Sequence, residues 1–142
     1  LTHAPEAYKN DIKLFKKEFK NYPWIEVLHF LGPKKKGESK RSHAERVYKK
    51  DIKDCVGTCD VMIGELSIPS LGLGYELSTL IEKRRLRTMM CAQRSKKVSN
   101  LPYGAPFHVD NPHASFKWYK KSILELMPYF VKELELLRST VK

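Results

Sequence analysis

The sequence predicts an α/β domain in which helices flank a mainly parallel sheet. Two observations lead to this fold class: short apolar runs of strand length recur along the chain, and amphipathic helical patterns separate them. Strands that alternate with helices form βαβ units, whose strands run parallel. With 142 residues, of which 42% are hydrophobic, residues 1–142 fit a single domain with its own core.

An amphipathic helix is the first predicted element. Pro5 and Glu6 suit its first turn, and Pro23 ends it. The apolar run at 24–31 then predicts a buried strand, because it is short and is followed by a Gly-Pro pair. The apolar residues of the helix recur at spacings of four, three and four: Tyr8, Ile12, Phe15 and Phe19.

The remaining elements follow in regular alternation. Ser42 and Glu45 have the spacing of a capping box, which predicts a helix that starts there and continues to about Gly57. Ser122 is the predicted cap of a long final helix. Between these two helices we expect strands at 61–66, 88–92 and 115–120, a helix at 75–85, and loops at 67–74 and 93–104.

Composition limits the classes of function. The net charge of +11 permits an anionic small substrate or nucleic acid, but most lysines alternate with glutamates along helices, which disfavours nucleic acid. No apolar run is long enough to span a membrane and no leader pattern opens the sequence, so we expect a cytoplasmic protein. One exposed loop is expected to gather basic residues: Lys34, Lys35, Lys36, Lys40 and Arg41.

Neither a metal nor a cofactor is expected. Cys55 and Cys59 lie four residues apart, but no third and fourth ligand follows at the spacing of a structural zinc site. Together with Cys91 they make an odd number of cysteines, which disfavours a disulfide framework. Gly72 and Gly74 lack the third glycine of a dinucleotide fingerprint.

The segment 69–76, Pro-Ser-Leu-Gly-Leu-Gly-Tyr-Glu, carries the candidate site. Because it follows a predicted parallel strand, it should lie at the carboxyl edge of the sheet, where α/β folds bind ligands. Gly72 and Gly74 allow the backbone to approach a ligand closely, and the hydroxyl of Ser70 with the next helix N-terminus suits an anion. Glu76, in the first turn of that helix, is interpreted either as a catalytic carboxylate or as a partner of the helix dipole.

Residues 60–76, DVMIGELSIPSLGLGYE, resemble the signature of the nucleoside 2-deoxyribosyltransferase superfamily, and most closely its deoxynucleoside 5'-monophosphate N-glycosidases. Residues 48–52, YKKDI, resemble the acidic helix motif of that family, and residues 97–99, KVS, resemble its next active-site loop. The resemblance covers most of the chain. It implies a Rossmann-like (flavodoxin-like) parallel sheet and a homodimer or higher homo-oligomer.

The resemblance also implies a role for each matching residue. Glu76 matches the nucleophile that attacks the anomeric carbon of the sugar. Asp51 matches the second carboxylate, which orients the substrate or donates a proton to the departing base. Ser70 and Gly72 match contacts to the 5'-phosphate, with Gly74 in the same segment, and Ser99 matches a serine that reaches the phosphate in a neighbouring subunit.

One departure from the family concerns its first strand and turn, which supply a tyrosine and a loop that cradles the phosphate or sugar. The sequence opens at Leu1-Thr-His-Ala-Pro, where that turn is already ending, and Tyr8 does not match the tyrosine. Because the strand is central in the family's sheet, its loss would leave backbone groups unpaired. We therefore expect the sequence to be part of a longer chain, and the alternative is a homologue with weak or no catalysis.

These observations predict hydrolysis of the N-glycosidic bond of 2'-deoxynucleoside 5'-monophosphates through a covalent deoxyribosyl-Glu76 intermediate. The first alternative is base exchange between deoxynucleosides by the same intermediate. The second is a nucleotide-binding homologue without turnover, or a basic protein that binds nucleic acid. The sequence does not set the base preference.

Overall fold

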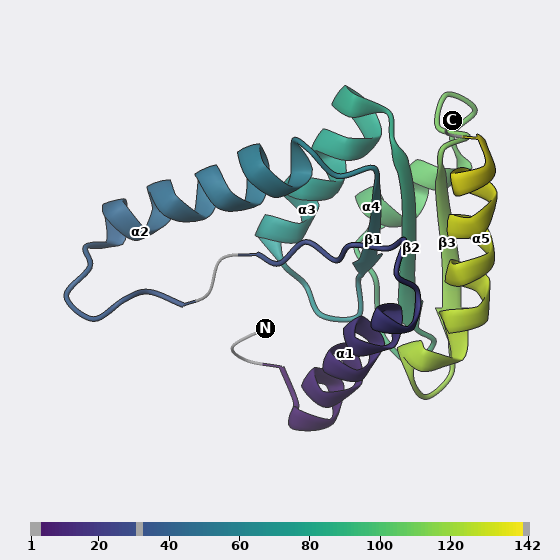
Figure 1. Cartoon of the computed structure of the whole chain (residues 1–142), viewed down its shortest axis with the longest axis horizontal. Helices are drawn as coiled ribbons and strands as arrows, with labels where there is room; N and C mark the ends of the chain where they lie inside the picture. Colours follow the sequence, from purple (N-terminus) through teal and green to yellow (C-terminus); the bar gives the residue numbers. More distant parts are fainter. Residues whose placement is uncertain (1–3, 31–32, 141–142) are drawn as a thin grey trace.

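The computed structural model describes residues 4–30 and 33–140 and places a parallel sheet of three strands between helices (Figure 1). The strands are β1 (Val61–Glu65), β2 (Arg87–Gln93) and β3 (Ala114–Tyr119), and they lie in that order. The α-helices are α1 (Glu6–Glu18), α2 (Lys40–Val47), α3 (Leu71–Ser78), α4 (Asn100–Gly104) and α5 (Met127–Thr140). The predicted α/β class and the parallel, Rossmann-like (flavodoxin-like) sheet are confirmed.

Shorter helical segments extend several of these helices. The π-helix η2 (Tyr48–Val56) continues α2 to Gly57, as predicted, and the π-helix η3 (Thr79–Arg84) continues α3. Three further segments are 3-10 helices: η1 (Phe19–Asn21), η4 (Ala105–Phe107) and η5 (Ile123–Leu126). The prediction of a loop at 93–104 is wrong for its last part, because α4 forms there.

Each face of the sheet has its own hydrophobic core. On one face, Met89 and Cys91 of β2 pack with Phe15 of α1 and Phe130 of α5. On the other face, Met90 packs with residues of α3 and η3. Successive strand residues point to opposite faces, so one apolar strand supplies both cores. This explains why the strands appear in the sequence as short apolar runs.

The prediction of a strand at residues 24–31 is wrong for residues 24–30, and Leu31 lies outside the described residues. Ile25 and Val27 pack against the core beside α1, and the guanidinium of Arg138 lies 4.8 Å from the centre of the Trp24 ring. Within the described sheet, β1 pairs with β2 alone. An apolar pattern indicates that a segment is buried. A strand also requires a neighbouring strand with which its backbone can hydrogen bond.

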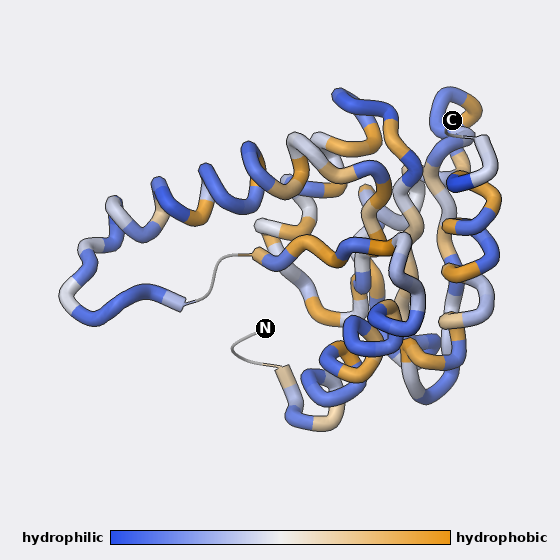
Figure 2. The backbone as a smooth tube through the Cα atoms, in the orientation of Figure 1, coloured by the Kyte–Doolittle hydropathy of each residue, from blue (hydrophilic) through white to orange (hydrophobic). Residues whose placement is uncertain are grey.

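Helix α2 begins earlier than predicted. Its N-cap is Ser39, whose Oγ accepts a hydrogen bond from the backbone N–H of Ser42 at 3.1 Å. The capping box predicted at Ser42 is therefore wrong, and Glu45 instead binds Arg41 on the helix surface at 3.0 Å. Lys40, predicted in a loop, is the first residue of this helix. The helix extends away from the sheet, and its far end is hydrophilic (Figures 1 and 2).

The predicted cap at Ser122 is confirmed, and it is a full capping box. Ser122 Oγ accepts from Leu124 N–H at 3.2 Å, while Ser122 N–H donates to Glu125 Oε2 at 2.8 Å. Two more backbone N–H groups, those of Lys120 and Lys121, also donate to Glu125. These hydrogen bonds hold the pKa of Glu125 below its usual value.

Ser122, which caps a helix, and Ser42, which does not, allow a test of the observed caps. We expect Ser122→Ala to lower the free energy of unfolding by about 1 kcal/mol, because it removes a cap beside the core. The same substitution at Ser42, inside α2, should change stability by no more than a few tenths of a kcal/mol. Urea denaturation of both variants measures the two effects. Equal losses would contradict the observed caps.

No helix within residues 4–30 and 33–140 is long and apolar enough to cross a membrane.

Candidate active site

Helix α3 carries most of the predicted site residues, and it starts directly after the carboxyl end of β1. Its N-cap is Ser70, whose Oγ accepts a hydrogen bond from Leu73 N–H at 3.1 Å. The prediction of a loop over 67–74 and of a helix that starts at Tyr75 is therefore wrong for residues 71–74, which belong to the helix. The serine cap at residue 70 allows the helix to start at Leu71 although two glycines follow.

Gly72 and Gly74 thus lie inside the first turns of α3, where glycine lowers helix stability by about 1 kcal/mol relative to alanine. Packing does not require them. A Cβ at Gly74 would meet no atom of the described residues within 4 Å, and one at Gly72 would only reach Ser70 Oγ at 3.8 Å. The glycines leave the backbone of this turn open to a molecule that approaches it from solvent.

Glu76 lies in the second turn of α3 instead of the first, and its side chain is buried, with the residue only 8% exposed. Burial is the main cause that raises the pKa of Glu76 to about 7, and the charge of Asp51 adds to it. The next residue, Leu77, packs against Gly64 of β1, which fixes the helix against the sheet. Glu76 is therefore held near the carboxyl end of β1.

Asp51 lies on η2, whose first residue, Tyr48, contacts Tyr75 of α3. Its charge acts on Glu76, and both carboxyl groups also act on Cys55, whose pKa is raised first by burial of the thiol. Cys55 is in turn held by the backbone of residues 24–30, since its Sγ donates to the carbonyl of His29 at 3.5 Å. The two predicted carboxyl groups are close enough for their charges to interact, although they lie 25 positions apart in the sequence.

Two tyrosines connect the helices that carry these carboxyl groups. Tyr48, three residues before Asp51, and Tyr75, directly before Glu76, form an edge-on ring contact with centroids 6.5 Å apart. Both side chains are substantially exposed, at 46% and 56%. They were absent from the predicted site, and the signal that could have identified them is their position beside the two acidic residues.

Ser99, the last predicted site residue, does not belong to this group. It is the N-cap of α4, a separate short helix that contacts α3. Large apolar side chains are exposed around that helix: Leu101 at 87%, Phe107 at 70% and Val109 at 86%. Such a patch is typical of a surface that another molecule covers.

The sequence matches no protein-family model, and it has no match among curated proteins. The family resemblance of residues 60–76 therefore remains a prediction.

Proposed function

We propose that this chain hydrolyses the N-glycosidic bond of 2'-deoxynucleoside 5'-monophosphates, with Glu76 as the nucleophile. The observation that carries the proposal is the buried Glu76 beside Asp51, on a helix that starts at the carboxyl edge of the sheet. Ligands of open α/β sheets bind at this edge. Two carboxyl groups in different environments are what a retaining glycosidase needs.

In the first step, a carboxylate oxygen of Glu76 forms a bond to C1' of the sugar, and the bond from C1' to the base nitrogen breaks. The electron pair of that bond goes to the base, which takes up a proton from solvent through a water that the Asp51 carboxylate orients. In the second step, water attacks C1', releases 2-deoxyribose 5-phosphate and regenerates Glu76. The hydroxyl of that water stays on the sugar, and its other proton goes to solvent.

The 5'-phosphate is assigned to the start of α3. Because Ser70 Oγ accepts the hydrogen bond of Leu73 N–H, its own hydroxyl hydrogen can be donated to a phosphate oxygen. The bare turn at Gly72 and Gly74 allows a phosphate to approach the backbone, and the positive end of the helix dipole favours its charge. The net charge of +11 adds long-range attraction.

A second copy of the chain is part of this proposal. The exposed Leu101, Phe107 and Val109 support a homodimer or higher homo-oligomer in which this patch is covered. Ser99 at the start of α4 would then contribute to the phosphate site of the neighbouring copy.

Base exchange between deoxynucleosides is the second candidate. The exposed pair of Tyr48 and Tyr75 favours it, because exposed aromatic rings on the two helices that carry the carboxyl groups can stack on an incoming base. Both reactions share the intermediate on Glu76, and they differ only in the acceptor. The proposed location is the cytoplasm, and the proposed chemistry uses neither a metal nor a cofactor.

The experiment is a panel of the four deoxynucleotides and four deoxynucleosides, each with and without a free acceptor base, analysed by chromatography. Release of base from deoxynucleotides without acceptor supports hydrolysis, and a new nucleoside formed only with acceptor supports exchange. Mass spectrometry of the acid-quenched enzyme should find the mass of the sugar phosphate added to the peptide that contains Glu76. The absence of any base release on the complete natural chain would overturn both.

The pH profile is a further prediction. Since only the ionised carboxylate of Glu76 is nucleophilic, kcat/KM should rise with pH through about 7, where Glu76 ionises. Asp51→Asn removes a negative charge that raises this pKa, so it should move the rise to lower pH, while also slowing the maximal rate. Rates of both proteins from pH 5 to 9 measure the shift. A rise that moves to higher pH in Asp51→Asn would contradict the pairing of the two carboxyl groups.

A further inference from the structure

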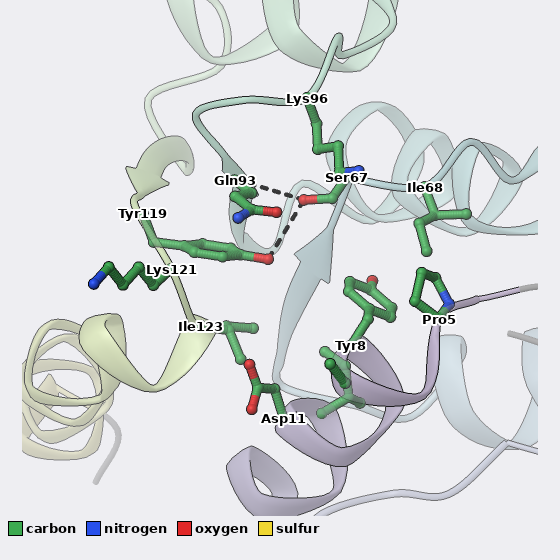
Figure 3. A pocket seen from close by; sticks show the side chains of 12 residues that line it. Pro5, Tyr8, Asp11, Ser67, Ile68, Gln93, Lys96, Tyr119, Lys121 and Ile123 are labelled. Atoms are coloured by element: carbon green, nitrogen blue, oxygen red, sulfur yellow. Dashed lines mark hydrogen bonds between the residues drawn. The ribbon is translucent and has the colours of Figure 1, made fainter.

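A pocket of about 230 Å³ lies at the start of α1, between the segment that follows β1 and the ends of β2 and β3 (Figure 3). It opens on the face of the sheet that α1 and α5 cover. Gly64 of β1 packs against Leu77 of α3, whereas the next residue, Glu65, hydrogen bonds to Tyr119, which belongs to the core beneath α1 and α5. The pocket and the helix that carries Glu76 are therefore on opposite faces.

The wall of the pocket is built on the half-buried carboxylate of Glu65. Tyr119 donates its hydroxyl hydrogen to Glu65 Oε2, and Ser67 Oγ donates to the same atom at 3.0 Å. The backbone N–H of Ser67 donates to Glu65 Oε1, and Ser67 Oγ accepts from the N–H of Gln93 at 2.8 Å. The ends of all three strands are joined by these hydrogen bonds.

The charge of Glu65 also acts on Tyr8 of α1. Burial, and after it the Glu65 carboxylate, raise the pKa of Tyr8 well above the usual value of tyrosine, and burial with the hydrogen bond to Glu65 does the same for Tyr119. Both phenols are therefore neutral, and the hydroxyl hydrogen of Tyr119 is directed to Glu65. What they offer to the pocket is the remaining lone pairs of their oxygens, which accept hydrogen bonds.

The charges around the pocket balance. Lys96 and Lys121 line it together with Asp11, and Glu65 lies behind the tyrosines. In Figure 3 the Lys121 ammonium extends away from the space between Tyr8 and Tyr119, while Asp11 lies at the opposite end from Lys96. The carboxylates of Asp11 and Glu65 would therefore repel an anion. A neutral molecule is not repelled, and no charge has to be removed from water when it binds. Isoleucines supply apolar walls: Ile12, Ile68 and Ile123.

We infer that this pocket binds a free nucleobase. A base is neutral and flat, and its N–H groups can donate to the oxygens of Tyr8 and Tyr119, while a ring carbonyl or an unprotonated ring nitrogen can accept from Lys96. Its faces are apolar enough to lie against the tyrosine rings and the isoleucines. The choice of a nucleobase among neutral heterocycles rests on the proposed function, in which the base is the first product. Ser67 and Ile68, which line the pocket, lead directly into the helix of Glu76.

Ala7 provides the test, because it is exposed, lies on α1 and lines the pocket. We expect thymine, cytosine and adenine to bind the full chain with a Kd of about 0.1 to 1 mM, as measured by isothermal titration calorimetry. Ala7→Phe should fill the mouth of the pocket and weaken this binding at least fivefold. The matched control is Ala44→Phe on α2, also exposed and remote from the pocket, which should leave the Kd within a factor of two.

Glu76→Gln separates this inference from the proposed function. We expect the variant to bind the bases with unchanged affinity in the pocket of Tyr8, even though it does not release base from a deoxynucleotide. Base binding that Ala7→Phe leaves unaltered, or no binding up to several millimolar, would overturn the pocket assignment even if turnover is intact. Loss of binding in Glu76→Gln but not in Ala7→Phe would also overturn it, by placing the base at the catalytic site alone.

Discussion

Glu76→Gln is expected to lower the rate of base release by about 10³-fold or more, because the amide cannot form the covalent bond to C1'. Glu76→Ala should have the same effect. Folding should survive both changes, since Glu76 is a buried carboxyl group whose charged form is disfavoured where it lies. The measurement is the initial rate on a deoxynucleotide with matched concentrations of folded protein.

The control for this prediction is Glu82→Gln. Glu82 is an exposed residue of η3, in the same continuous helical run, so the substitution is chemically identical and leaves the site intact. It should retain the wild-type rate. A Glu76→Gln protein that keeps more than a few per cent of wild-type turnover would remove Glu76 from the role of nucleophile.

The same variant has a second, thermodynamic readout. The pKa of Glu76 is about 7 in the folded chain and 4.5 in an ordinary environment, so the folded state holds a proton that the unfolded state releases. Stability is therefore lost as pH rises from 4.5 to 7 and stays lower above pH 7. Glu76→Gln should raise the free energy of unfolding at pH 8 by on the order of 2 kcal/mol, and this gain should disappear at pH 4. Such a gain is expected where a residue is kept for function at the expense of stability.

Local patterns were sufficient to predict most of the fold. The apolar runs at 61–66 and 88–92 and the alternating segment 115–120 each became a strand within one or two residues. For β2, which is buried on both faces, a short apolar run is sufficient. The segment 24–30 has the same pattern and is not a strand. Its apolar side chains are buried, but strand pairing depends on a distant segment that a local pattern does not describe.

The start of α3 shows a different kind of error. Gly72 and Gly74 predict a loop, since glycine is the weakest helix former after proline, yet the cap at Ser70 and the packing of Leu77 on Gly64 hold the residues in a helix. Tertiary contacts outweigh a propensity of about 1 kcal/mol for each glycine. The consequence for the site is a shift of Glu76 from the first helical turn to the second, where it is buried.

The pocket of Tyr8 was not predictable from neighbouring residues. Its hydrogen bonds join Glu65 to Tyr119 across 54 positions, and no local spacing encodes such a contact. One signal was present in the sequence: Glu65 is a charged residue at the end of an otherwise apolar strand. A charge that is even partly buried in that position rarely lacks partners, so it indicates a cluster of hydrogen-bond donors at the strand end.

We expect kcat/KM for a deoxynucleoside 5'-monophosphate to exceed that for the free deoxynucleoside at least tenfold. The Ser70 hydroxyl and the backbone of the Gly72 turn each offer a hydrogen bond to the phosphate, and a charge-assisted hydrogen bond contributes roughly 1.5–3 kcal/mol before desolvation. The part of this preference that comes from the net charge of +11 should decrease as salt is raised.

Ser70→Asp tests the assignment without disturbing the helix, because aspartate caps a helix as well as serine does. The new carboxylate should repel the phosphate and lower kcat/KM for the deoxynucleotide at least about tenfold, while the free nucleoside is used within twofold of wild type. Ser39→Asp is the matched control: Ser39 is also a serine N-cap whose Oγ accepts a backbone hydrogen bond, but it lies at the far end of α2. It changes the net charge equally and should leave the preference intact.

If Ser70→Asp and Ser39→Asp behave alike, the phosphate does not bind at the start of α3. If the free nucleoside is also the better substrate, base exchange replaces hydrolysis as the function that the site of Glu76 and Asp51 performs.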